Sequence, residues 1–253
     1  DASQYEIYKP FVKRVWRIDR AEMFPEILDK AFRLAESGRP GPVLISVPMD
    51  MFSREVDTRF FERTYLDSHE TVKPSLDEEA AKKIVKALVE AKNPVIHVGG
   101  GIILARASEE LKDFVEFLEI PVSRTLMGQG ALSDKHPLMM GMTGFWGTYF
   151  INGKTSQADV ILGLGTRFAE ADSSSWYNGI TFDADKTKFM QIDIEPSEIG
   201  RNYPVSIGAE ADLKSALKVL LKVAKELYPN GKKHPEIIKA IEKYKKEFKD
   251  SNK

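Results

Sequence analysis

NPVIHVGGG, residues 93–101, joins a short apolar strand to a run of three glycines. A helical stripe precedes this stretch, and its apolar members are Leu76, Ala80, Ile84, Leu88 and Ala91. Ser75 and Glu78 have the spacing of a capping box, so we expect Ser75 to be the N-cap of that helix. A second stripe follows the glycines, with Leu104, Ala107, Leu111, Phe114, Val115 and Leu118. Helix, strand, glycine turn and helix in succession are typical of a parallel α/β sheet.

The same alternation continues toward the C-terminus. Further strands are predicted in IPVSRTL (120–126), ADVILGLGTRF (158–168), KFMQIDIE (188–195) and PVSIGA (204–209). A closing helical stripe consists of Leu213, Leu217, Leu220, Leu221 and Ala224. We therefore expect an α/β fold in which an open parallel sheet has helices on both faces.

Residues 1–50 predict a smaller α/β piece. A strand in FVKRVWRI (11–18) precedes a helix with Pro25 in its first turn and Gly38 as its C-cap. The apolar run Pro42–Val47, within SGRPGPVLISVPMD, has the pattern of a strand buried on both faces. Such a strand needs a neighbour on either side, and the residues before it are too few to supply them. We therefore expect residues 1–50 to be part of a larger α/β domain.

The remaining segments suggest domain boundaries. Residues 51–74 are irregular and charged, which predicts a linker on the surface. Residues 75–229 hold the alternating helices and strands. Residues 230–253 include HPEIIKAIEKYKKEFKD, which predicts a charged surface helix with a thin apolar stripe.

Composition excludes several classes of function. The 253 residues carry a formal net charge of −1, which gives no sign of a nucleic-acid or anionic-membrane partner. The sequence contains no apolar run of membrane-spanning length, and its first residues have no signal-peptide pattern. Cysteine is absent, which excludes disulfides and thiolate chemistry and is compatible with a reducing cytoplasm.

Small and polar residues stand where the predicted strands end. In open parallel sheets ligands bind at the carboxyl ends of the strands. Gly99–Gly101 precede a helix, so their backbone N–H groups could hold a diphosphate. Arg167 could add a charge-assisted bond to phosphate, and Asp193 could accept a hydrogen bond from a ribose hydroxyl.

Each of these residues also has a purely structural interpretation. The glycines could form a tight turn, Arg167 a surface ion pair, and Asp193 the cap of the helix that opens at PSEIG. The apolar cluster Met127, Met139, Met140, Met142, Phe145 and Trp146 is either core or a flat wall for an aromatic ring system. We expect Met139 and Met140 to be core.

Histidine and serine offer no catalytic pattern. We expect His97, which lies inside a strand, to be a packed core residue, and His136 to be solvated in a loop. The serine run ADSSSWYNG (171–179) has neither a nucleophile elbow nor an evident histidine partner, which excludes a serine hydrolase.

Five motifs, in this order, resemble the thiamine-diphosphate-dependent enzymes, most closely acetolactate (acetohydroxyacid) synthase large subunits. They are SGRPGPVLISVPMD, NPVIHVGGG, TLMGQGAL…HPLMMGMTGFWGT, ADVILGLGTRF and KFMQIDIEPSEIGRN. The resemblance implies three consecutive α/β domains, of which residues 1–50 would be the end of the pyrimidine-binding first domain. Residues 75–229 would be the Rossmann-like central domain, and residues 230–253 would lead toward a third domain. We therefore expect the chain to be a fragment of a longer enzyme and to be inactive alone.

The resemblance also implies an activity and its cofactors. Family members use thiamine diphosphate and Mg²⁺ to decarboxylate a 2-oxo acid such as pyruvate and transfer the product to a second carbonyl. Their binding motifs for these two cofactors are absent from this sequence. The central domain would hold FAD or another adenine nucleotide, and the enzyme would be a cytoplasmic homodimer or homotetramer. A related decarboxylase or hydrolase, a free-standing nucleotide-binding module, and a structural spacer with an empty cleft remain alternatives.

Matched motifs carry over candidate site residues, none of them catalytic. Residues near the substrate channel would be Gln4 and Lys13. Residues at the FAD site would be Arg39, Gly99, Gly100, Gly101, Thr125, Leu126, Met127, Gly144, Phe145, Trp146, Gly165, Thr166, Arg167, Asp193, Ile194 and Asp212. The chain departs from the synthases in two places. It has GFWGT where they usually have GMHGT, so Trp146 replaces a histidine, and GTRFAEAD where they usually have GVRFDDR.

Overall fold

The structure, a computed structural model, describes residues 3–62 and 72–251 of the chain. The chain divides into two compact units, residues 1–72 and 73–253, and each is described by itself. The N-terminal unit contains a two-stranded parallel sheet of β1 and β2, with Val15 paired to Leu44. Its elements are α1 (Gln4–Tyr8), β1 (Val15–Arg17), η1 (Ala21–Met23), α2 (Phe24–Glu36), β2 (Leu44–Ser46), η2 (Met49–Ser53) and α3 (Arg59–Glu62).

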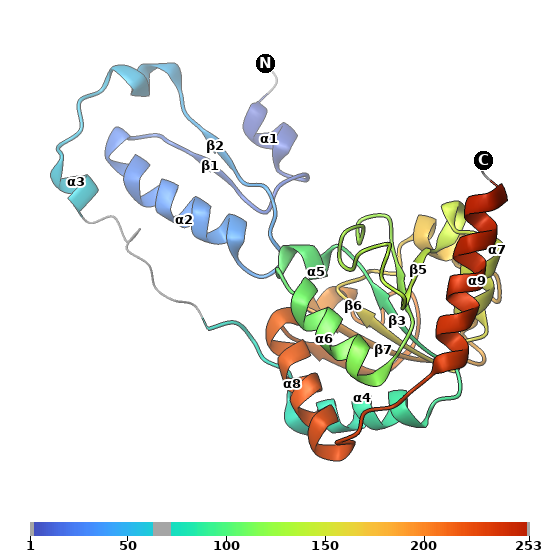
Figure 1. Cartoon of the computed structure of the whole chain (residues 1–253). Helices are drawn as coiled ribbons and strands as arrows, with labels where there is room; N and C mark the ends of the chain where they lie inside the picture. The colour runs from blue at the N-terminus through green and yellow to red at the C-terminus, as the bar shows by residue number, and fades with distance from the viewer. Residues whose placement is uncertain (1–2, 63–71, 252–253) are drawn as a thin grey trace. The chain divides into compact units, whose positions relative to one another are not determined.

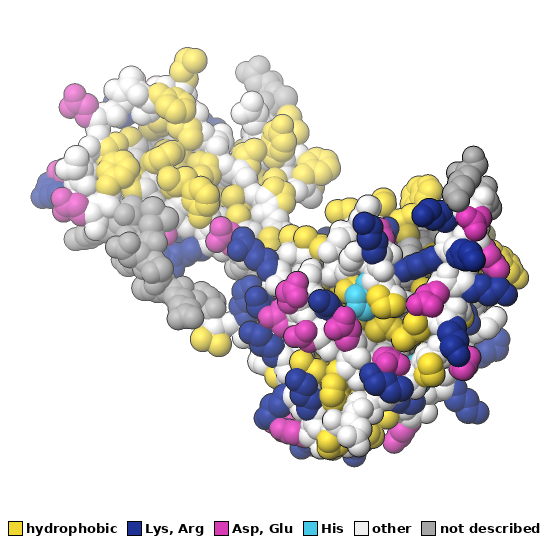
Figure 2. All heavy atoms as spheres, in the orientation of Figure 1, with side chains coloured by type: hydrophobic (Ala, Val, Ile, Leu, Met, Phe, Trp, Pro, Cys, Tyr) yellow, Lys and Arg dark blue, Asp and Glu magenta, His cyan; other side chains and the backbone are white. Residues whose placement is uncertain are grey.

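The structure corrects two expectations for the N-terminal unit. The residues of β2 are half-buried rather than buried on both faces, because β1 is the only strand that pairs with β2 among residues 3–62. The C-cap of α2 is Ser37, and Gly38 follows it in the left-handed conformation with φ +51°. Figure 2 shows many hydrophobic side chains on the surface of this unit. Large ones that are exposed include Phe11, Phe32, Met49 and Phe52.

The linker predicted at residues 51–74 falls only partly within the described residues. Its first part contains the end of η2 and the short helix α3. Residues 63–71 lie outside the described part of the chain.

The larger unit is built on a six-stranded parallel sheet with helices on both faces, as the sequence predicts. Its strands are β3 (Pro94–Val98), β4 (Val122–Arg124), β5 (Met139–Met142), β6 (Val160–Leu164), β7 (Lys188–Asp193) and β8 (Val205–Glu210). Its α-helices are α4 (Glu78–Glu90), α5 (Gly101–Leu104), α6 (Ser108–Leu118), α7 (Tyr149–Ser156), α8 (Leu213–Leu227) and α9 (Pro235–Ser251). Short 3₁₀ segments are η3 (Gly144–Trp146), η4 (Glu170–Trp176) and η5 (Pro196–Glu198).

The strand order is β5-β4-β3-β6-β7-β8. The chain therefore starts in the middle of the sheet, builds outward to β5, and returns to the other side of β3 with β6. This is the order of the dinucleotide-binding α/β folds. The order reverses between β3 and β6, whose residues pair from Pro94 with Val160 to Val98 with Leu164.

Two apolar clusters fix the helices to the sheet. On one face, α4, α6 and α8 pack over alternate strand residues such as Ile96, Leu162 and Ile192. On the other face, Ile151 of α7 and Ile241 of α9 pack with Ile161 and with aromatic residues from the loops. Successive strand residues point to opposite faces, so nearly continuous apolar strands are needed to serve both clusters.

Two further expectations differ in the larger unit. Helix α4 is capped by Asp77, whose carboxylate accepts from the N–H of Ala80 at 2.9 Å, and not by Ser75. The stripe expected to begin at Leu104 is split into α5 and α6, and Leu104 is 64% exposed. Met139 and Met140 are buried in β5, which confirms that they belong to the core. No helix within residues 3–62 or 72–251 is long and apolar enough to cross a membrane.

Candidate functional site

The carboxyl edge of the larger sheet gathers most of the residues singled out from the sequence. Loops after β3, β4, β5, β6 and β7 all leave this edge. Where the strand order of such a sheet reverses, the two loops diverge to opposite faces and leave a crevice in which ligands bind. The reversal lies between β3 and β6, so the glycine run and the segment that begins at Gly165 border that point.

The glycine run after β3 is packed directly against the loop after β6. A Cβ atom at Gly99 would lie 2.2 Å from the carbonyl oxygen of Gly165, and one at Gly101 would lie 2.6 Å from its Cα. The N–H of Gly99 donates to Leu164 and that of Gly101 donates to Gly165. Only glycine permits this approach. The two bonded amides are therefore occupied, and Gly100 is the member of the run whose N–H has no backbone partner among the described residues.

The loop after β4 lies against the glycine run. Thr125 is buried, and its hydroxyl accepts a hydrogen bond from the N–H of Gly128 at 3.0 Å. Leu126 and Met127 are 49% and 71% exposed. A Cβ atom at Gly100 would lie 3.2 Å from the carbonyl oxygen of Met127. The loop therefore presents two apolar side chains next to the glycines.

The loop after β5 presents two aromatic residues. Phe145 and Trp146 are 57% and 62% exposed, and their rings meet edge to face with centroids 6.3 Å apart. Gly144 has φ +83°, and a Cβ atom there would lie 1.9 Å from the carbonyl oxygen of Ala171 in η4. Glycine is therefore required where this loop crosses η4.

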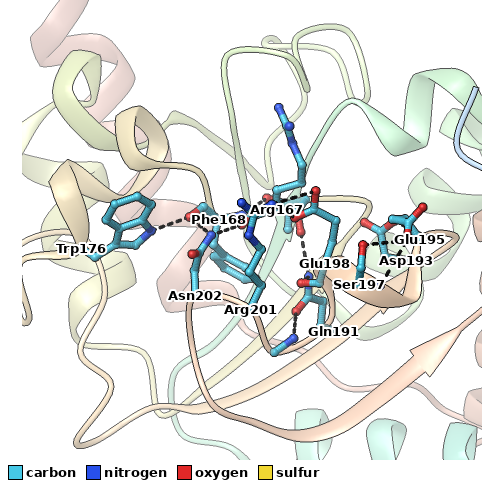
Figure 3. A network of polar contacts seen from close by, with 12 residues as sticks. Arg167, Phe168, Trp176, Gln191, Asp193, Glu195, Ser197, Glu198, Arg201 and Asn202 are labelled. Carbon is cyan, nitrogen blue, oxygen red and sulfur yellow. Dashed lines mark hydrogen bonds and ion pairs between the residues drawn. The ribbon is translucent and has the colours of Figure 1, made fainter. Parts of the chain in front are cut away.

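The loop after β6 is held by a polar network, shown in Figure 3. The side-chain amide of Gln191 donates to the carbonyl oxygen of Thr166 at 3.0 Å. That of Asn202 donates to the carbonyl oxygen of Arg167 at 2.9 Å. Trp176 donates from Nε1 to the carbonyl oxygen of Phe168. The backbone is thus fixed, while the Arg167 side chain is exposed and extends away from the network.

Asp172, which the sequence did not single out, joins three of these loops. Its Oδ1 accepts from the N–H of Leu126, and its carbonyl oxygen accepts from the hydroxyl of Thr143 at 3.0 Å. Burial raises the pKa of its carboxyl, whereas the hydrogen bond from Leu126 and the charge of Arg167 oppose that rise. The sequence feature that could have pointed to Asp172 is its position five residues after Arg167, within GTRFAEAD, where the chain differs from the synthases.

The residues predicted for the adenosine end are engaged in local structure. Asp193 is buried, and its Oδ1 accepts from the N–H of Glu195 at 3.0 Å; Ile194, beside it, is half-buried. Asp212 caps α8 by accepting from the N–H of Ser215, and its other oxygen lies 3.3 Å from the Lys73 ammonium group. These residues lie at the ends of β7 and β8, but their carboxylates already have partners.

Three candidates, Gln4, Lys13 and Arg39, belong to the N-terminal unit and not to the unit that contains the sheet edge. Gln4 is exposed in α1 and Arg39 is exposed after α2. The ammonium group of Lys13 donates to the carbonyl oxygens of Leu34, Ser37 and Arg39, at 2.6, 2.8 and 3.2 Å. Lys13 therefore satisfies the C-terminal end of α2 in this structure.

The buried histidine is structural, as its sequence context predicts. His97 is fully buried between Phe168 and Phe182, and its Nδ1 lies 3.0 Å from the Ser123 hydroxyl. Burial lowers its pKa to about 3. The side chain of His136 is nearly buried, contrary to expectation, with Nε2 3.0 Å from Glu116. Within the described residues, no group of three His, Asp or Glu side chains is arranged to hold a metal ion.

Comparison with known proteins identifies the family. A family model described as "Thiamine pyrophosphate enzyme, central domain" matches residues 81–220. The chain belongs to the thiamine pyrophosphate enzyme family. The matched residues extend from α4 into α8, and so include the whole six-stranded sheet and the edge described above.

Individual relatives agree with this family. A probable acetolactate synthase large subunit of Methanococcus aeolicus is 38% identical over 228 residues, covering 85% of this chain and 36% of the relative. One of Methanocaldococcus jannaschii is 36% identical, with coverage of 85% and 36%. Glyoxylate carboligase of Escherichia coli O157:H7 is 36% identical, with coverage of 89% and 37%. The chain therefore spans little more than a third of these relatives' length, and the resemblance to acetolactate synthase large subunits is confirmed.

Proposed function

We propose that this chain is part of a thiamine-diphosphate-dependent carboligase of the acetolactate synthase kind, and that its sheet edge binds FAD or another adenine nucleotide. The relatives named above support the first part, since two are probable acetolactate synthase large subunits and the third is a carboligase by name. The second part rests on the edge between β3 and β6, where strand order reverses beside glycines, an exposed cation and exposed apolar side chains.

The residues of this edge fit a nucleotide in distinct ways. The N–H of Gly100 and the guanidinium of Arg167 would bind phosphate oxygens. Leu126, Met127 and Trp146 would cover an aromatic ring system. Asp193, Ile194 and Asp212 fit less directly, because the two carboxylates would have to exchange the partners that they now have.

The chemical step belongs to the whole protein. Thiamine diphosphate with Mg²⁺ would supply the electron sink for decarboxylating a 2-oxo acid such as pyruvate. We assign no catalytic residue to this chain and expect it to show no turnover by itself. Incubating the isolated chain with pyruvate, thiamine diphosphate and Mg²⁺ tests this expectation, and release of CO₂ above background would contradict it.

Nucleotide binding is tested by calorimetric titration of the full-length protein with FAD, ADP and NAD, together with its flavin absorbance after purification. Arg167→Gln is expected to weaken binding of the diphosphate-containing ligands about tenfold or more, because a charge-assisted hydrogen bond is lost. Lys112→Gln, which removes an exposed cation from α6, is the control and is expected to have no effect. If none of the three nucleotides binds the wild-type protein, the spacer alternative is favoured.

The remaining alternatives separate by activity and mass. Nucleotide binding without any thiamine-diphosphate-dependent reaction would favour a free-standing nucleotide-binding module. Release of an aldehyde or of a hydrolysis product, without carbon–carbon bond formation, would favour a related decarboxylase or hydrolase.

The proposed assembly and location are tested separately. Light scattering on the full-length protein tests the proposed homodimer or homotetramer, and cell fractionation tests the proposed cytoplasmic location. The exposed apolar side chains of the N-terminal unit support a further chain segment that completes its sheet.

A further inference from the structure

The aromatic loop, residues 144–147, begins with Gly144, ends with Gly147 and carries the exposed Phe145 and Trp146 between them. Glycines give a loop many accessible conformations, so a fixed arrangement of these rings needs contacts from outside the loop. Asn152 of α7 supplies two: its Nδ2 donates to the carbonyl oxygen of Gly144, and its Oδ1 accepts from the N–H of Gly144, both at 3.0 Å. The first end of the aromatic loop is thus clamped to α7.

The other end of the aromatic loop is tied to α9. Thr148 follows the loop directly and is the N-cap of α7. The hydroxyl of Tyr244, 96 residues further on, donates to the Thr148 hydroxyl oxygen at 2.7 Å. The Tyr244 ring also stacks on Phe150, with centroids 4.2 Å apart and planes 7° from parallel. Figure 1 shows α9 beside α7.

Helix α9 is itself anchored to the larger unit at this point. Ile241, one turn before Tyr244, is 1% exposed and belongs to the second apolar cluster. The ammonium group of Lys245 donates to the carbonyl oxygens of Asp134 and His136, at 2.9 and 2.8 Å. Contacts on both sides of Tyr244 therefore hold its hydroxyl where it reaches Thr148.

We propose that Tyr244 and Asn152 are positioning residues that hold Phe145 and Trp146 in place for a ring-containing ligand. Tyr244 lies in α9, outside the family-matched residues 81–220. Helix α9 would therefore contribute to the site a positioning residue that the matched central domain does not contain. The ligand part of this inference rests on the nucleotide site proposed above. The positioning part rests only on the hydrogen bonds and the ring stack.

The test uses ¹⁹F NMR of the full-length protein labelled with 5-fluorotryptophan, with the Trp146 signal assigned by Trp146→Phe. Tyr244→Phe deletes the hydroxyl but keeps the ring stack, and Asn152→Ala deletes the clamp on Gly144. Tyr228→Phe is the matched control, because no hydrogen bond of the Tyr228 hydroxyl is found in the described part of the chain. We expect the Trp146 signal to shift or broaden in the first two variants and not in the control. The signals of Trp16 and Trp176 should stay in place.

Titration of the same variants with FAD and ADP completes the test. Loss of one neutral hydrogen bond predicts binding about two- to tenfold weaker in Tyr244→Phe, with the control unchanged. An unchanged Trp146 signal in both variants overturns the positioning role, even if their thermal midpoints fall. If the Trp146 signal moves but the wild-type protein binds neither nucleotide, the positioning role stands and the proposed function fails.

Discussion

The backbone N–H of Leu126 donates a 3.1 Å hydrogen bond to Oδ1 of Asp172, 46 residues further along the chain. This contact joins the loop after β4 to the segment that follows β6, and the hydroxyl of Thr143 adds the loop after β5 through the Asp172 carbonyl oxygen. One residue, Asp172, therefore links these loops, with its half-buried carboxylate bonded to the loop after β4 and its backbone carbonyl oxygen bonded to the loop after β5.

Asp172→Ala removes the acceptor and leaves the Leu126 amide without this partner. We expect it to lower the free energy of unfolding by about 1–2 kcal/mol, measured by urea denaturation at pH 7. Asp172→Asn keeps an acceptor oxygen and removes a charge that burial disfavours, as the raised pKa indicates, so it should change that free energy by less than about 0.5 kcal/mol. Equal losses in the two variants would show that the charge, and not the hydrogen bond, matters.

We expect His97 to make the free energy of unfolding depend on pH. Its pKa is about 3 in the folded protein and 6.5 in the reference state. Between these two pH values the unfolded chain therefore binds a proton at His97 that the folded chain does not bind. Below pH 6.5, stability should therefore fall by up to about 1.4 kcal/mol per pH unit from this residue alone. Urea titrations at pH 7, 5.5 and 4.5 measure the slope. His97→Asn should be less stable at pH 7 but should have a shallower slope, and parallel curves for the two proteins would contradict this account.

The sequence predicted β3, β4, β6, β7 and β8. The strands β3, β6 and β7 have apolar side chains on both faces because both clusters draw on them, although His97 lies in β3 and Gln191 in β7. β5 was missed because the methionines of MMGM were interpreted only as core or as part of a ligand wall, and its pairing with β4 is set by the fold rather than by its own pattern. α7 was missed because YFINGKTS has no apolar stripe, and what stabilises it is the Thr148 cap and the packing of Ile151 in the second apolar cluster.

Only the part of the candidate site that lies directly at the strand ends could be predicted from the sequence. Alternation of strands and helices placed Gly99–Gly101 and Gly165 at one edge, and they lie there. The hydrogen bonds of Asp172 and Tyr244 could not be foreseen, because their partners are 46 and 96 residues distant in sequence. The close packing of Gly99 on Gly165 could not be predicted from the sequence either. This contact alone requires glycine at position 99, whether or not a ligand binds.

The N-cap of α4 is Asp77 in the structure, whereas the sequence predicted Ser75. Asp77→Ala removes the carboxylate that accepts from the N–H of Ala80, and should lower the free energy of unfolding by about 1 kcal/mol. Ser75→Ala, the change that a capping box beginning at Ser75 would make harmful, should have an effect close to zero. Chemical denaturation of both variants decides between the two caps, and the reverse order of effects would restore the prediction from sequence.

Two glycine-to-alanine changes test why the run after β3 is glycine. At Gly99 the new methyl group would lie 2.2 Å from a backbone oxygen of Gly165, so Gly99→Ala should destabilise the protein by about 2 kcal/mol or more. At Gly153, inside α7, a Cβ atom meets nothing within 4 Å, so Gly153→Ala should stabilise it by about 0.5–1 kcal/mol. Thermal and urea unfolding measure both. If Gly99→Ala were as stable as the wild type but bound FAD or ADP more weakly, the glycine would be needed for the ligand and not for the contact between the loops after β3 and β6.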